Sequence, residues 1–220
     1  MSDDVKTPSS AGPDLRAARV ARTETELIDA ARSLFLQQGY VATTLAQIAQ
    51  RAGLAARTVY VRFGTKAALF RRVVDRALVG DADPIDVAHR PRTQDAMAAP
   101  TLAERIDALA EVSVGIADRA GALFEVAAQA EGLEPELAHA AQAGRRATAE
   151  LCQAFWEHAA ADGLLADLAD QADPARLALL TDTLSCADTV VHLRRAHGWS
   201  APAHRALIVD TLAALTRLAP

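Results

Sequence analysis

The sequence lacks the long apolar runs and the cysteine framework of a membrane or secreted protein. It has no run of 18 or more apolar residues, so we expect no membrane span. Residues 1–22 contain no apolar stretch behind a basic start, so we expect no signal peptide. The 2 cysteines, Cys152 and Cys186, suit free, buried thiols of a reducing compartment. These features favour a cytoplasmic protein.

Signals for strands and for catalysis are also lacking. No stretch shows the apolar–polar alternation or the β-branched clusters that strands require. There is no glycine-rich phosphate loop, no HExxH motif and no nucleophile elbow. No Cys, His and Asp cluster has ligand spacing, and His192 and His197, five apart, fit one helix face poorly. We therefore expect an all-α protein that is not an enzyme and holds no metal or cofactor.

The net charge of −5 argues against nucleic acid only when the chain is taken whole. Residues 1–80 hold 12 Lys or Arg and 7 Asp or Glu, a net charge of +5. Residues 81–220 hold 11 and 21, a net charge of −10. A basic head on an acidic remainder is expected when only one end of a protein meets a polyanion.

Capping residues and apolar periodicity predict about nine helices. Thr23 and Glu26 form a capping-box pair that we expect to open the first helix, and Gly39 stands where a C-cap would end it. The other predicted helices are 44–53, 55–61, one from Lys66, 101–118, 122–130, 135–161, 174–197 and 202–218, with a loop over 80–100 that could hold one helical turn.

Residues 44–63, TLAQIAQRAGLAARTVYVRF, are typical of a helix-turn-helix. Thr44 and Gln47 form a capping box at the first helix, and Gly53 supplies the tight turn. With its apolar residues packed inward, the second helix leaves Arg57 and its neighbours at the surface. A surface helix of this kind fits the major groove of DNA, about 12 Å wide.

Residues 31–70 resemble the DNA-binding domain of the tetracycline-repressor-like (TetR) family of bacterial transcription regulators. The matching features stand in order: a Gly-aromatic pair, a Thr-Thr cap, the Ile-Ala and Ala-Gly around the turn, Thr-Val-Tyr in the next helix, and a Lys after it. The rest of the chain matches that family in helix count and layout only. The resemblance implies a three-helix DNA-binding domain over 21–81 after a disordered basic arm over 1–20, and a larger helical effector-binding and dimerisation domain over 82–220.

The resemblance also implies individual DNA contacts. Thr44 and Lys66 would each hold a phosphate at the start of a helix. Arg57 is our choice for reading sequence, because its guanidinium can bond guanine O6 and N7. The other implied contacts are Ala46, Gln47, Ala56 and Thr58 near base edges, and Tyr60, Val61 and Arg62 beside the backbone.

One departure and several simpler interpretations stand beside these roles. Ala55 occupies a position where the family commonly has a capping Ser, at a cost of about 1 kcal/mol. Arg57 and Arg62 could be ordinary solvated charges, and Tyr60 and Phe63 could serve the core alone. The arginines of the arm could enter a minor groove or belong to a solvated tail; they are Arg16, Arg19 and Arg22.

The last two predicted helices each carry an apolar stripe that suits a homodimer interface. The stripes are Leu177, Leu180, Leu184, Val190 and Val191 on one helix, and Leu207, Ile208, Leu212, Leu215 and Leu218 on the other. They could equally be the core of a monomer. A dimer would set two recognition helices about 34 Å apart, one turn of duplex DNA.

The resemblance further implies a small-molecule effector bound among the helices of the second domain. Candidate contacts, chosen by residue type and helix, are Phe124, Gln129, His139, Cys152, Phe155, Trp156, Asp182, Cys186 and His192. Each could also be an ordinary packed or exposed residue. Polar residues among apolar neighbours are suggestive because their burial must be offset by hydrogen bonds.

Together these features predict a ligand-responsive repressor. It would bind a palindromic double-stranded operator as a homodimer, and an effector would favour a shape in which the helix from Lys66 swings the heads out of register. Two alternatives stay open. One is an all-α enzyme, for which the sequence contains no supporting motif. The other is a ligand-independent architectural DNA binder, which should have a broader basic surface.

Overall fold

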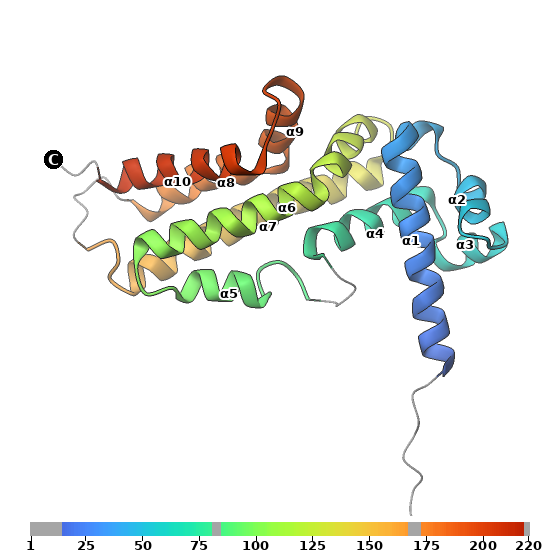
Figure 1. Ribbon diagram of the computed structural model, residues 1–220, viewed down its shortest axis with the longest axis horizontal. Helices are drawn as coiled ribbons and strands as arrows, with labels where there is room; N and C mark the ends of the chain where they lie inside the picture. The colour runs from blue at the N-terminus through green and yellow to red at the C-terminus, as the bar shows by residue number, and fades with distance from the viewer. Residues whose placement is uncertain (1–14, 81–84, 167–172, 218–220) are drawn as a thin grey trace, which may run out of the picture.

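The structure is a computed structural model that describes residues 15–80, 85–166 and 173–217. Within these ranges the chain forms ten α-helices and no strand. The helices are α1 (Leu15–Ala42), α2 (Leu45–Arg51), α3 (Ala56–Phe63), α4 (Lys66–Val79), α5 (Pro91–Ala98), α6 (Leu102–Ala130), α7 (Pro135–Ala161), α8 (Pro174–Ser185), α9 (Ala187–Ala196) and α10 (Ala201–Arg217). Helices α1 to α4 gather at one end, here called the head, and α5 to α10 form an elongated body (Figure 1).

The first helix begins earlier than the sequence pattern predicts. α1 includes residues 15–22, which we expected to fall in a disordered arm or its edge, while residues 1–14 lie outside the described residues. Residues 15–22 read LRAARVAR, and Leu, Ala and Arg are strong helix formers. The helix therefore continues on the N-terminal side of Thr23 and Glu26, whose capping-box pattern lies inside it.

The helix-turn-helix forms as the sequence predicts. Thr44 Oγ1 accepts a hydrogen bond from the Gln47 N–H at 3.2 Å, and Gln47 Oε1 accepts one from the Thr44 N–H at 2.8 Å. Gly53, with φ of 67°, makes the turn, a conformation that suits glycine. Ala55 is the N-cap of α3 and offers no side-chain bond, as expected.

Three predicted boundaries in the body are wrong. Pro91–Ala98 forms α5 inside the predicted loop, with Pro at the helix start. α6 runs unbroken through Gly121, where a break was predicted. The predicted helix 174–197 is two helices, because Cys186 has extended backbone angles, φ −67° and ψ 156°, between α8 and α9.

Gly121 serves a close approach between helices instead of a break. A Cβ atom at this position would lie 3.2 Å from Val190 Cγ1 and 3.1 Å from Arg194 Cδ, both on α9. The missing side chain therefore lets α9 pack directly against the backbone of α6.

Two clusters of buried apolar residues form the core. The first contains Phe35 and Phe70 of the head together with Leu123 in the second half of α6. The second lies in the body, where Ile106 in the first half of α6 packs with Trp156 of α7 and with residues of α8 and α10. The 29 residues of α6 span about 44 Å, so one helix contributes to both cores.

Much of the two predicted dimer stripes is buried within the protomer. Leu177, Ile208 and Leu212 belong to the body core, and Leu218 lies outside the described residues. The large apolar residues that stay exposed on α8 and α10 are Leu179 and Leu207.

Candidate nucleic-acid interface and effector site

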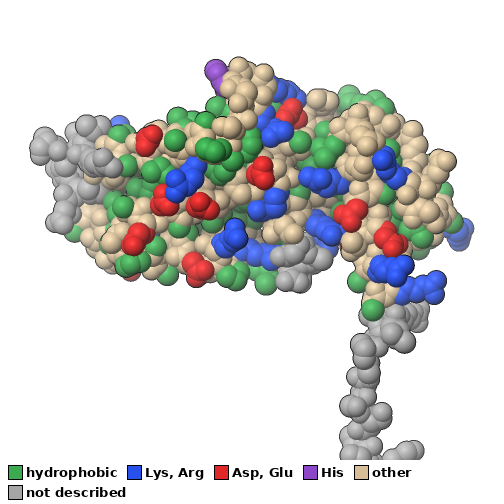
Figure 2. Space-filling model, in the orientation of Figure 1, with side chains coloured by type: hydrophobic (Ala, Val, Ile, Leu, Met, Phe, Trp, Pro, Cys, Tyr) green, Lys and Arg blue, Asp and Glu red, His purple; other side chains and the backbone are tan. Residues whose placement is uncertain are grey.

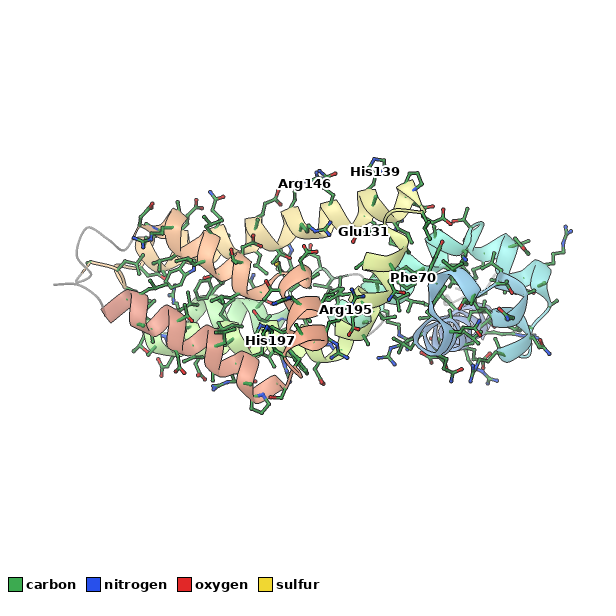
Figure 3. All side chains as sticks on the ribbon, turned by 90° about the horizontal axis from the view of Figure 1, so that it is seen from above. Phe70, Glu131, His139, Arg146, Arg195 and His197 are labelled. Atoms are coloured by element: carbon green, nitrogen blue, oxygen red, sulfur yellow. The ribbon has the colours of Figure 1, made fainter. Side chains whose placement is uncertain are left out.

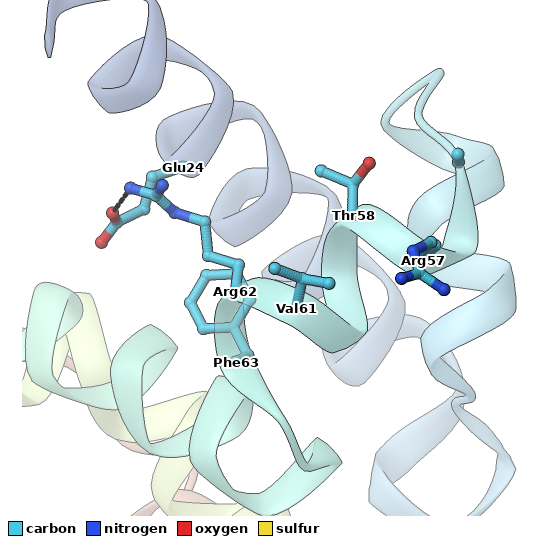
Figure 4. Close-up of a pocket in the computed structure, with 7 residues that line it drawn as sticks. Glu24, Arg57, Thr58, Val61, Arg62 and Phe63 are labelled. Carbon is cyan, nitrogen blue, oxygen red and sulfur yellow. Dashed lines mark hydrogen bonds and ion pairs between the residues drawn. The ribbon is translucent and has the colours of Figure 1, made fainter.

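The outer side of α3 carries the residues that the resemblance assigns to DNA. Arg57, Thr58 and Val61 line an open hollow beside α1 (Figure 4). Val61 is 76% exposed and Tyr60 is 55% exposed, so neither belongs to the core. Arg57 is exposed and makes no ion pair with any residue that the structure describes. An unpaired guanidinium keeps its full fork of donors for a guanine or a phosphate.

Arg62 lines the same hollow, and its guanidinium is turned towards Glu24 of α1. Its Nη2 donates to Glu24 Oε2 on α1 (Figure 4), and Glu24 also pairs with Arg72 of α4 at 3.4 Å. The hydrogen bond from Arg62 is the largest cause that lowers the pKa of the Glu24 carboxyl below its ordinary value. Glu24 therefore ties α3 to α1 and α4, and the guanidinium of Arg62 is engaged within the protein.

Sequence reasoning did not find Glu24. Its partners lie 38 and 48 residues away in the chain, so no local spacing signals the contact. The available clue was an acid in a basic head, because a carboxylate near a surface proposed to bind DNA repels phosphate unless a cation holds it.

Two predicted phosphate contacts begin helices. Thr44 is exposed at the start of α2, and the exposed Ala46 follows it. Lys66, at the start of α4, is half-buried: its Nζ donates to the Tyr40 carbonyl at 2.9 Å and lies 4.1 Å from the centre of the Tyr40 ring. Lys66 thus fastens α4 to the end of α1 and retains two of its three donors. Of the other contacts, Gln47 and Ala56 are exposed.

Polar contacts fasten the head to the body. The Tyr40 hydroxyl donates to Glu134 Oε1 at 3.2 Å, ahead of α7, and burial followed by the Glu134 charge raises the pKa of Tyr40, which keeps it a donor. Arg119 of α6 donates to the carbonyls of Ala77 and Leu78 at 3.2 and 2.8 Å. The end of α4 is therefore held by α6.

The structure divides the candidate effector contacts among four places. Phe155 and Trp156 lie in the body core, where Trp156 Nε1–H donates to Thr181 Oγ1 at 2.8 Å, so its polar group is already satisfied. Gln129, His139 and His192 are exposed, His139 pointing outward from α7 (Figure 3). Phe124 is half-buried and packs against the head core.

Cys152, Asp182 and Cys186 come together where α7, α8 and α9 meet. Burial, followed by the Asp182 charge and Cys186, raises the pKa of the Cys152 thiol to about 12. Such an electrostatic effect requires the groups to be close in space. Asp182 Oδ1 is buried and accepts no hydrogen bond from any described residue, and burial raises the pKa of this carboxyl.

Two other features are absent from the described residues. No group of three or more His, Cys, Asp and Glu side chains in these ranges could hold a metal ion. No described helix has both the length and the apolar character needed to cross a membrane.

Comparison with known proteins supplies a family for the head. Residues 27–73 match the family model described as bacterial regulatory proteins, tetR family. The HTH-type transcriptional repressor ComR of Escherichia coli (strain K12) is 47% identical over 49 residues, which are 22% of this chain and 23% of ComR. The match thus spans less than a quarter of this chain and of that curated relative.

Comparison of whole structures covers nearly the entire chain. A Mesorhizobium loti protein whose crystal structure was assigned to the TetR family superposes with a TM-score of 0.71 at 19% identity, covering 91% of this chain and 98% of that one. A Saccharomonospora viridis protein, solved with choline and described as a transcriptional regulator, gives 0.66 at 16% identity over 88% and 96%. Residues 27–73 therefore match the tetR family model, and the chain as a whole has the fold of these solved proteins.

Proposed function

We propose that the protein is a transcriptional repressor that binds a palindromic DNA operator as a homodimer and leaves it when a small molecule binds the body. The observation that carries this proposal is the outer face of α3. Arg57, Thr58 and Val61 are displayed on a short helix that the Glu24 contacts hold in place. We place this activity in the cytoplasm, where operators are.

In the proposed complex, α3 lies in the major groove. Arg57 bonds a guanine edge, and Val61 contacts a thymine methyl group. The N–H groups at the start of α2, with Thr44, bind a phosphate. Cationic side chains also gather near the N-terminal end of α1 (Figure 2), which strengthens attraction to the duplex.

A second copy joins through α8 and α10. Leu179 and Leu207 remain exposed on these helices, at 65% and 39%, and would be buried between the copies. The two-fold symmetry of such a dimer matches the symmetry of a palindrome, with recognition helices about 34 Å apart.

Ligand binding in the body reaches the head through α6. Because α6 belongs to both cores and Arg119 holds the end of α4, a shift of α6 moves α4 and α3 with it. A ligand that favours the shifted shape thus lowers operator affinity. The choline complex of the S. viridis protein supports a small-molecule ligand for this fold.

Binding-site selection from random duplex DNA tests the proposal. We expect wild-type protein to enrich a palindrome, and Arg57→Ala to lose about 1–3 kcal/mol of preference at one base pair in each half-site. Arg146→Ala, at an exposed arginine on α7 (Figure 3), is the matched control and should select the wild-type site unchanged. Selection that enriches no site, or an Arg57→Ala protein with undiminished preference, would contradict the proposal.

A further inference from the structure

Two exposed histidines, His192 and His197, meet at the C-terminal end of α9. Their Nε2 atoms are 3.2 Å apart and their ring centres are 5.0 Å apart, although a spacing of five residues fits one helix face poorly. His197 is the C-cap of α9, and its backbone angles, φ −126° and ψ 10°, depart from those of a helix. This departure allows the His197 ring to reach back to His192, and both side chains are open to solvent.

The two distances fit a pair of imidazoles that share one metal ion. Two nitrogens bound to a tetrahedral ion at about 2.0–2.1 Å lie about 3.3 Å apart, and their ring centres lie about 5.2 Å apart. A straight N–H···N hydrogen bond of the observed length would separate the ring centres by about 5.5 Å, because both ring axes would lie along the bond. At 5.0 Å the ring axes are inclined to the line between the nitrogens, as they are in two ligands of one ion.

The turn that carries His197 is anchored to the neighbouring helices. Trp199 Nε1–H donates to His204 Nδ1 at 3.2 Å, and His204 Nε2–H donates to the Leu184 carbonyl of α8 at 2.9 Å. His204 is only 2% exposed and lies near the start of α10, so the turn between α9 and α10 is tied to α8 and α10. Ligands that are held in place before binding lose little conformational entropy when the ion arrives.

The charges at the end of α9 also suit a cation. The helix ends at His197, and the negative end of the helix dipole favours positive charge. Arg194 and Arg195, in the last turn, are both bonded to Glu125 of α6: Arg194 Nε donates to its carboxylate at 2.6 Å, and Arg195 Nη2 donates to its carbonyl at 3.2 Å. Both guanidinium groups are therefore held at α6, where the Glu125 carboxylate offsets part of their charge.

We propose that His192 and His197 bind one divalent ion of the zinc, nickel and copper class through their Nε2 atoms. Imidazole nitrogen is a preferred ligand of these ions, whereas Mg²⁺ and Ca²⁺ prefer oxygen. Each neutral ring then carries its hydrogen on Nδ1. No third His, Cys, Asp or Glu among the described residues completes a metal-binding group here, so water fills the remaining positions. The ion joins the second turn of α9 to its C-cap and stabilises the end of the helix.

Calorimetric titration of the full-length protein with Zn²⁺, in the absence of DNA, tests the site. We expect wild type to bind one ion per chain and to bind no Mg²⁺ at the same concentrations. His192→Ala and His197→Ala should each weaken Zn²⁺ binding by more than about tenfold, because a single imidazole remains. His139→Ala, which removes an exposed histidine of α7 (Figure 3), is the matched control and should bind Zn²⁺ as wild type does.

Chemical modification of wild type locates the ion without a variant, so it decides the matter even where a variant fails to fold. Diethyl pyrocarbonate acylates accessible imidazole nitrogens. Zn²⁺ should therefore slow the modification of His192 and His197, and leave that of His139 unchanged, as read by peptide mass spectrometry.

Three results would overturn the metal site. They are a wild type that binds no Zn²⁺, a His192→Ala or His197→Ala protein that binds it as tightly as wild type, and equal protection of His139. Neither experiment contains DNA, so failure of the metal site leaves the repressor proposal intact, and a protein that selects no operator can still bind the ion.

Discussion

Two arginines five residues apart on α3 have different roles because of what lies beside them. Arg57 is exposed and has no ion-pair partner among the described residues, whereas Arg62 is bound to Glu24. The sequence places both on a surface helix and gives them the same charge. Only the folded position of α1 distinguishes Arg57, which we propose reads DNA, from Arg62, which is bound to Glu24.

Glu24→Gln should destabilise the head by about 1 kcal/mol, because it removes the charge that joins Arg62 and Arg72. The folded-state pKa of Glu24 is lowered, so its contribution is present above the unfolded-state pKa and is lost as the pH falls through the folded value. Urea unfolding at pH 7 should therefore separate variant from wild type, and unfolding in acid should not. Glu26→Gln, whose partner Arg22 is highly exposed, is the control and should have little effect.

The two cysteines should differ in reactivity. Burial raises the pKa of Cys152 to about 12, so at pH 8 only about one molecule in ten thousand carries its thiolate. Cys186 is half-buried at the break between α8 and α9. Iodoacetamide at pH 8, followed by peptide mass spectrometry, should modify Cys186 first and reach both cysteines in urea. Equal rates in the folded protein would contradict this difference.

Among the elements, α6 depends on a glycine for its contact with α9. Gly121→Val should destabilise the protein by about 1–3 kcal/mol, because the new side chain meets Val190 and Arg194. Gly144→Val is the matched control: Gly144 lies inside α7, and a Cβ there meets nothing within 4 Å. Its effect should stay within about 0.5 kcal/mol in urea unfolding. Similar losses of stability at the two positions would show that helix propensity, and not the contact with α9, governs the effect of Gly121→Val.

Local chemistry made the helix-turn-helix predictable from the sequence. The capping box at Thr44 and the turn at Gly53 act within a few residues, and both form as predicted. The body was less predictable because its boundaries depend on distant partners. In the sequence Gly121 resembles a helix breaker, and only the packing of α9 shows its actual role. The residue type of Cys186 does not indicate that the helix breaks there.

The candidate DNA-binding residues were likewise more predictable from the sequence than the candidate effector contacts. Exposure of Arg57 and Val61 follows from the amphipathic pattern of α3, so the sequence could indicate the side that we propose faces DNA. The engagement of Trp156 with Thr181, and the unmet oxygen of Asp182, arise from contacts between helices. Residue type alone could not show that the Trp156 N–H is already hydrogen-bonded whereas an oxygen of Asp182 is not.

For the whole molecule, dimerisation should depend on the apolar residues left exposed on α8 and α10. Leu179→Glu with Leu207→Glu should convert a dimer into a 23.2 kDa monomer, because the charges would be buried between copies. Leu133→Glu is the control, since Leu133 is about as exposed as Leu179 but lies between α6 and α7. Sedimentation velocity distinguishes the species. A double variant that remains dimeric would show that the dimer interface does not lie on these two residues.

The central claim is that two copies of α3 enter successive major grooves of one duplex. Hydroxyl-radical footprinting of wild-type protein on its selected site tests this claim most directly. We predict two symmetric protected stretches whose centres lie about 34 Å, or one helical turn, apart. A single protected stretch, or even protection along the whole duplex, would contradict it.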